Sequence, residues 1–145
     1  MYTLATLNPI HAAEKTILAL GDSLTAGFGL NGSDSFPSRL QMALRAAGHK
    51  VRVINGGVSG DTTAGGLARL DWLMQDRPDV VIVELGGNDA LRGLPPAGTR
   101  RNLDGIIKRV KEKGAKVILA GMLAPPNMGK AYTAAFNPIF PDLAQ

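Results

Sequence analysis

The sequence predicts an α/β fold, a sandwich of three layers in which helices cover both faces of a parallel sheet. Short apolar runs, rich in β-branched residues, alternate four times along the chain with longer segments of helical periodicity. The runs are apolar at nearly every position, which is typical of strands that are covered on both faces. At 145 residues and 45% hydrophobic content, the chain suits one domain with its own core.

Four apolar runs are expected to form the strands of the sheet. They are residues 16–20, 51–54, 80–85 and 117–120. Crossovers between parallel strands are right-handed, and ligands bind beyond the carboxyl ends of such strands. The segments that follow the four runs should therefore meet at one functional edge.

Four helices are expected to connect and follow these strands. They are residues 36–47, a segment that starts near residues 61–63, residues 99–114 and residues 131–143. We expect Asp34 or Ser35 as the N-cap of the first helix and Thr99 as the cap of the third. The last segment contains Pro138 and Pro141, which should kink it or delay its start.

The start of the chain differs from the rest. We interpret residues 1–13 as a signal-peptide remnant or, alternatively, a disordered tail, and residues 14–145 as the domain. The segment Ile10-His11-Ala12-Ala13 resembles the cleavage end of a secretory signal. No stretch approaches the roughly 18 apolar residues of a membrane-spanning helix, so we expect no stable insertion into a membrane.

Composition excludes several kinds of site. The chain has no cysteine, which excludes disulfides, a thiolate nucleophile and a cysteine-based zinc site. The formal net charge of +4 comes from 16 basic and 12 acidic residues. The densest basic run, residues 108–113, has no aromatic residues within it, which favours a solvated helix face over a nucleic-acid partner.

Polar residues suited to acyl transfer follow three of the four predicted strands. Ser23 comes after the first strand, Gly60 after the second and Asn88 after the third. Their two backbone N–H groups and one side-chain amide would supply three hydrogen bonds to one oxyanion. Each residue also has a local interpretation, as a helix cap, a positive-φ glycine or a turn residue. Their coincidence at three successive strand ends favours a site.

Two phosphate-binding patterns fail on their context. Residues 27–32 match the glycine pattern of a dinucleotide site, but six residues separate them from the strand that should end beside the first glycine. Residues 56–66 are glycine-rich and open a helix, but they lack the Gly-Lys-Ser/Thr of a phosphate loop.

Three blocks of the sequence resemble the SGNH, or GDSL, hydrolases. They are Gly-Asp-Ser-Leu at 21–24, Ser-Gly-Asp-Thr at 59–62 and Gly-Gly-Asn-Asp at 86–89. The longer phrases at 66–70 and 84–93 are similar to the bacterial thioesterase I/lysophospholipase L1 branch, also called arylesterase. The resemblance extends from about residue 15 to the end of the chain.

This resemblance implies the flavodoxin-like fold of that family and a serine ester hydrolase of the esterase, lipase, thioesterase or lysophospholipase type. It implies Ser23 as the nucleophile that forms an acyl-enzyme. Ser23, Gly60 and Asn88 would form the oxyanion hole, and the substrate would be a small ester or thioester. It also implies that no metal or cofactor is used, and that the protein is periplasmic or secreted, with a cytoplasmic location as the alternative.

The fourth block of the family, Asp-x-x-His, is absent from this sequence. The two histidines, His11 and His49, precede predicted strands and so belong to the opposite edge of the sheet, roughly 17–20 Å from Ser23. We therefore interpret the domain as truncated before its last strand and helix, and expect weak or no activity. The fourth strand would become an exposed edge, which predicts self-association.

Two other functions fit the same predicted scaffold, because fold alone does not fix function. One is a non-catalytic module that binds acyl groups or carbohydrate. The other is a flavodoxin-like carrier of a cofactor.

Overall fold

The computed structural model describes residues 12–145. The segment 1–13, predicted to be a signal-peptide remnant or a tail, lies almost entirely outside the described residues, as does His11. The division of the chain near residue 14 therefore stays a prediction.

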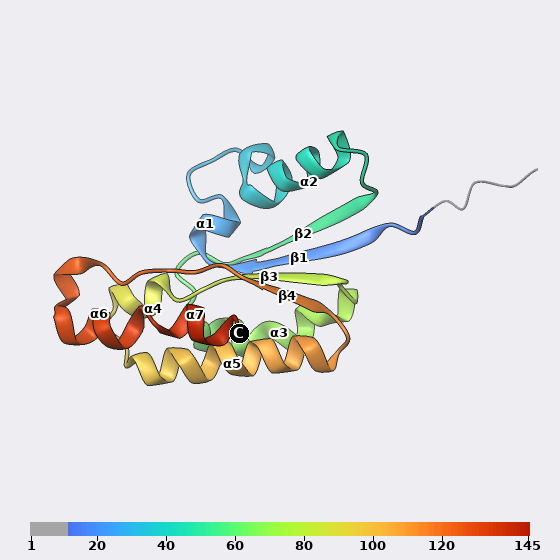
Figure 1. Ribbon diagram of the computed structural model, residues 1–145. Helices are drawn as coiled ribbons and strands as arrows, with labels where there is room; N and C mark the ends of the chain where they lie inside the picture. Colours follow the sequence, from blue (N-terminus) through green and yellow to red (C-terminus); the bar gives the residue numbers. More distant parts are fainter. Residues whose placement is uncertain (1–11) are drawn as a thin grey trace, which may run out of the picture.

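A sheet of four parallel strands forms the middle layer of the described residues (Figure 1). The strands are β1 (Lys15–Gly21), β2 (Val51–Gly57), β3 (Val80–Glu84) and β4 (Lys116–Leu119), in the spatial order β2–β1–β3–β4. All four predicted strands are confirmed. β2 continues beyond its predicted end because residues 55–57 still pair with residues 19–21 of β1.

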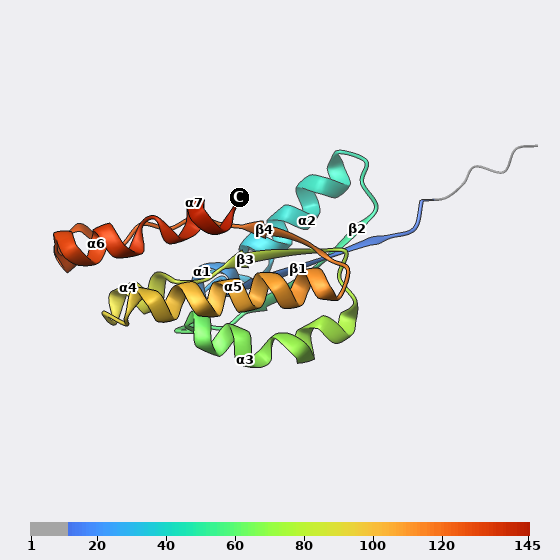
Figure 2. The ribbon, with the colours of Figure 1, turned by 60° about the horizontal axis from the view of Figure 1, so that its bottom comes forward.

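Helices lie on both sides of this sheet, as predicted. Figure 1 shows α1 (Ser23–Ala26) and α2 (Phe36–Ala46) on one side, and α3 (Thr63–Leu73) and α5 (Pro96–Glu112) on the other. The shorter helices are α4 (Gly87–Leu91), α6 (Lys130–Phe136) and α7 (Ile139–Leu143), with 3-10 turns η1 (Gly32–Asp34), η2 (Met74–Asp76) and η3 (Pro126–Met128). Figure 2 shows α3 and α5 lying side by side, and α6 and α7 also contact α5.

The helix boundaries correct one prediction and confirm two others. Thr99 does not cap α5, because the helix already begins at Pro96, a residue suited to the first helical turn. Ser35 does occupy the N-cap position of α2, although its hydroxyl donates to the carbonyl of Gly32 (2.9 Å) and caps no helical N–H group. The last predicted helix is interrupted just before Pro138, which separates α6 from α7.

The core lies between the sheet and the layer that contains α3 and α5. Its fully buried side chains include Leu18, Leu20, Leu70, Val81, Val83, Leu85, Leu103, Ile106, Val110 and Phe136. The opposite face of the sheet is covered less completely. Ile118 of β4 is 54% exposed, whereas its neighbours Val117 and Leu119 are partly buried and pack against the core. β4 lies at one edge of the sheet, as predicted. Self-association through that edge stays a prediction.

We expect Leu103→Ala to lower the free energy of unfolding by about 2–5 kcal/mol, because it removes a fully buried side chain of α5 from the core. Leu30→Ala is the matched control. Leu30 is exposed, and this variant should change stability by less than about 0.5 kcal/mol. Urea denaturation of both variants tests the assignment, and equal stabilities would contradict it.

Candidate active site

The register of the sheet brings three strand ends to the same level. Gly21, the last residue of β1, pairs with Gly57 of β2 on one side and with Glu84 of β3 on the other. The loops that carry Ser23, Gly60 and Asn88 therefore leave the sheet side by side. The predicted meeting of these segments at the carboxyl edge is confirmed.

Ser23 is the first residue of α1, a single helical turn that follows β1 directly. Asp22 is its N-cap, and the Asp22 Oδ1 atom accepts a hydrogen bond from the backbone N–H of Leu24 (3.0 Å). The N–H of a first helical residue has no acceptor within its own helix. Among the described residues, the Ser23 hydroxyl has no hydrogen-bond partner either, so both groups are available to a ligand.

The Asn88 side chain in α4 joins the three loops. Its Nδ2 atom donates to the backbone carbonyl of Asp61 (2.8 Å) and to Oδ2 of Asp22 (3.2 Å). Asp61 follows Gly60, and Asp22 precedes Ser23, so one amide links the neighbours of both other predicted residues. Both amide hydrogens of Asn88 are engaged in this arrangement.

Gly60 has a backbone conformation that favours glycine. Its φ of +80° lies in the left-handed region, which side chains other than glycine adopt at a cost. Its carbonyl accepts a hydrogen bond from Nη2 of Arg92 (2.6 Å), while its N–H has no acceptor among the described residues. Gly60 therefore has the positive φ predicted for it, and its N–H group is available to donate to a ligand.

Glu84 lies beneath the turn that carries Ser23. Its Oε2 atom accepts hydrogen bonds from the Thr25 hydroxyl (2.8 Å) and from the Asp22 N–H (3.5 Å), while Oε1 is buried without a partner among the described residues. Burial raises the pKa of the Glu84 carboxyl, the hydrogen bond from Thr25 opposes this shift, and the nearby charge of Asp22 adds to it. Glycine at position 21 allows the Thr25 side chain to pack against the end of β1, because a Cβ at Gly21 would lie 2.0 Å from the Thr25 hydroxyl.

Asp89, next to Asn88, holds the helices behind the site. It is almost fully buried and accepts hydrogen bonds from the N–H (2.9 Å) and hydroxyl (2.5 Å) of Thr63 and from the hydroxyl of Thr99 (3.1 Å). These bonds join α4 to the start of α3 and to α5. The Thr99 side chain thus donates to a buried carboxylate inside the domain and, contrary to the prediction, does not cap the start of α5.

Arg69 is a contributor to the site that sequence reasoning missed. Its guanidinium donates to Asp61 Oδ2 (2.7 Å), to the carbonyl of Gly56 (2.8 Å) and to the carbonyl of Gly21 (3.0 Å). No helical spacing indicates the pair in the sequence, because Asp61 precedes the N-cap of α3 while Arg69 lies within the helix.

His49 lies where the sequence predicts, at the amino edge of the sheet. It is exposed in the connection between α2 and β2, beside a hollow that Ala13, Lys15 and Val51 also line. Among the described residues, no histidine lies at the carboxyl edge. Also within residues 12–145, no group of three or more His, Cys, Asp or Glu residues could hold a metal ion, and no helix is long and apolar enough to span a membrane.

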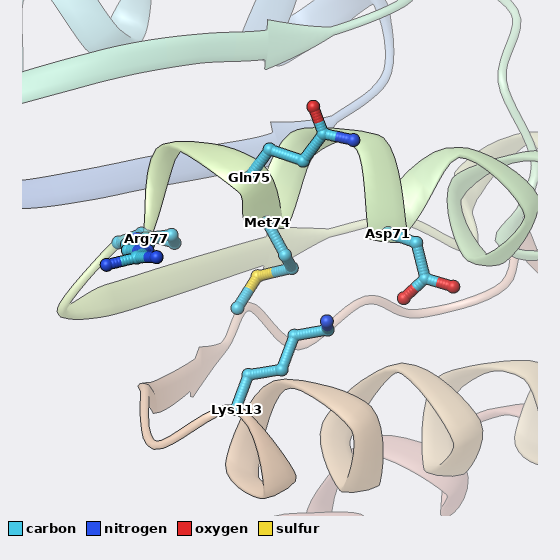
Figure 3. A pocket seen from close by; sticks show the side chains of 6 residues that line it. Asp71, Met74, Gln75, Arg77 and Lys113 are labelled. Carbon is cyan, nitrogen blue, oxygen red and sulfur yellow. The ribbon is translucent and has the colours of Figure 1, made fainter.

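A hollow of about 490 Å³ on the described surface also lies away from Ser23. Figure 3 shows that η2 and the end of α5 border it, near the start of β3. Its lining residues are Asp71, Met74, Gln75, Arg77, Pro78 and Lys113. Cavity size therefore does not identify the candidate site. The candidate site is identified instead by the hydrogen bonds that join the segments after three strands.

Comparisons with known proteins identify the family of the chain. Residues 19–145 match a family described as GDSL-like Lipase/Acylhydrolase. The chain is 46% identical to an arylesterase of Vibrio mimicus, over 96% of its own length and 70% of the relative's. It is 45% identical to esterase TesA of Pseudomonas aeruginosa, over 89% of its own length and 65% of the relative's.

Solved structures of esterases have a similar fold. The crystal structure of AlinE4, an SGNH-hydrolase family esterase, has a TM-score of 0.87 and 49% identity, covering 91% of this chain and 71% of that one. The crystal structure of TesA has a TM-score of 0.85 and 44% identity, covering 90% of this chain and 73% of that one. The chain spans 64–70% of the length of its curated relatives.

The raised pKa of Glu84 predicts a dependence of stability on pH. Between the ordinary pKa of 4.5 and the raised value, the unfolded chain is ionised at this position while the folded chain keeps its proton, so stability falls as the pH rises. Glu84→Gln removes this cost and can still accept the Thr25 hydrogen bond. We expect the variant to match the unchanged chain below pH 4 and to exceed it in stability at pH 7.

Thermal unfolding across this pH range tests the prediction. Thr25→Val removes the bond that favours the charged carboxylate, so it should steepen the loss of stability with rising pH. An unchanged pH profile in Glu84→Gln would contradict the account.

Proposed function

Since the chain belongs to the GDSL-like lipase/acylhydrolase family of serine hydrolases that act on ester bonds, we propose that Ser23 is the nucleophile of an ester hydrolase. One observation carries the proposal. The amide of Asn88 binds the neighbours of both Ser23 and Gly60, so the three residues named for the oxyanion hole share one hydrogen-bonded unit.

In the proposed reaction, the Ser23 Oγ attacks the acyl carbon of an ester or thioester. The bond between that carbon and the alcohol oxygen or thiol sulfur breaks, the leaving group takes up a proton, and the acyl group stays on Ser23. Water then hydrolyses this acyl-enzyme, which releases the acid and restores the serine hydroxyl.

The oxyanion formed in each step would accept hydrogen bonds from the N–H groups of Ser23 and Gly60 and from the Asn88 amide. Asn88 must first release one of its two present acceptors. The bond to Asp22 is the longer, at 3.2 Å against 2.8 Å for the bond to Asp61, so we propose that the oxyanion replaces Asp22. The bond to Asp61 then keeps the amide oriented.

The proton from Ser23 has no assigned acceptor in this sequence, because the chain holds no Asp-x-x-His and His49 lies at the other edge. We therefore propose that the chain by itself retains only the contribution of the oxyanion hole and of binding, roughly 10³–10⁴ over water.

The substrate class follows from the relatives and from the rim of the site. The curated relatives are named arylesterase, esterase TesA and thioesterase 1/protease 1/lysophospholipase L1. Exposed apolar side chains lie in the segments that follow β1 and β3, among them Phe28, Leu30 and, at the end of α4, Leu91. We propose that these side chains contact the acyl or aryl part of small esters and thioesters, in preference to a non-catalytic binding role for the same edge.

Covalent labelling tests the proposed nucleophile. A fluorophosphonate probe should label the chain slowly, because the oxyanion hole still stabilises the attack of Ser23 when no base is present, and Ser23→Ala should abolish the labelling. Ser33→Ala, at an exposed serine of η1, is the matched control and should be labelled like the unchanged chain. Labelling that survives Ser23→Ala would assign the nucleophile to another residue, and a chain that is never labelled would favour a binding module.

A further inference from the structure

We propose that Arg69 is a positioning residue that sets the separation between the two backbone donors of the oxyanion hole. This inference rests on the proposed function. Arg69 stands on α3, behind the site, and contacts neither Ser23 nor Gly60 directly. It acts through the residues that carry them.

Arg69 holds the ends of two strands. Arg69 donates from Nη2 to the carbonyl of Gly21 and from Nη1 to the carbonyl of Gly56. Gly21 is separated from Ser23 by one residue, and Gly56 lies near the end of β2, which leads to Gly60. A guanidinium is planar and presents its donors in a fixed fork, so it fixes the spacing of the two carbonyls.

Arg69 also holds Asp61, the residue beside Gly60. Asp61 binds the Arg69 Nε–H through Oδ2 (2.7 Å) and the N–H of Thr62 through Oδ1 (3.0 Å), while its carbonyl accepts from Asn88. Both the side chain and the backbone of Asp61 are therefore held. A Cβ at Gly65 would lie 1.8 Å from Asp61 Oδ1, so glycine at 65 permits this approach.

Burial distinguishes this ion pair from the others in the described residues. The side chains of Arg69 and Asp61 are 22% and 11% exposed, whereas those of Arg109 and Asp71 are 46% and 61% exposed. Exposed pairs contribute little, but a shielded pair with further hydrogen bonds holds its geometry. Arg109 bridges α5 and α3 without contacting a strand end, and so it supplies a matched control.

The consequence is specific to the reaction step. Displaced N–H groups would stabilise the tetrahedral state less, while the binding of the substrate in its ground state would change little. Arg69→Lys keeps the positive charge but cannot reach three acceptors with a planar fork. It should therefore lower the rate of the chemical step rather than the affinity.

The experiment measures fluorophosphonate labelling of Ser23 as a function of probe concentration. We expect Arg69→Lys to lower the maximal labelling rate by about 10–100-fold, as expected for a misplaced catalytic group. The half-saturating probe concentration should stay within about twofold, the sign of a transition-state effect. Arg109→Lys should change neither value. An unchanged maximal rate in Arg69→Lys, or a loss confined to the half-saturating concentration, would overturn the proposal.

A second measurement separates this proposal from the proposed function. In two-dimensional NMR spectra of the chain without probe, Arg69→Lys should shift the amide resonances of Ser23 and Gly60, and Arg109→Lys should not. If the unchanged chain is never labelled, the proposed function fails, yet these resonances still test the positioning. Unshifted resonances would overturn it. Should Arg69→Lys fail to fold, Asp61→Asn removes the charged partner of Arg69 and should produce the same two changes.

Discussion

The candidate site depends first on the pairing of β1 with both of its neighbours in one common register. Because Gly21 lies between Gly57 and Glu84, the chain leaves all three strands at the same level of the sheet. Short connections then suffice to place Ser23 and Asn88 at that edge. A slip of one residue in either pairing would turn the strand's side chains to the other face and separate these groups.

Carboxylates surround the place where negative charge would develop. Three of these carboxylates accept hydrogen bonds from backbone N–H groups and from an amide, hydroxyls or a guanidinium. They belong to Asp22, Asp61 and Asp89. Burial raises the pKa of Glu84, whose Oε1 atom has no hydrogen-bond partner among the described residues. An oxyanion in this surrounding needs preorganised donors, because like charges nearby disfavour it. The network that holds these carboxylates is thus also the network that fixes the donors.

The strands and the three predicted residues could be read from the sequence because both depend on local pattern. Apolar runs mark buried strands, and a parallel sheet must bring their carboxyl ends together. Contacts between distant segments could not be read this way. Thr99 has the composition of a cap but serves Asp89, and Arg69 lies inside a helix yet reaches two strand ends. Such partners depend on how α3 and α5 pack on the sheet, which no local pattern specifies.

The most direct test of the account is a crystal structure of the chain after reaction with a phosphonate ester, whose adduct resembles the tetrahedral state. We expect the phosphorus on the Ser23 Oγ and one phosphonyl oxygen at about 2.7–3.1 Å from the Ser23 N–H, the Gly60 N–H and the Asn88 amide, with the bond from Asn88 to Asp22 replaced. A phosphonyl oxygen directed to solvent, or an adduct on another residue, would contradict the account.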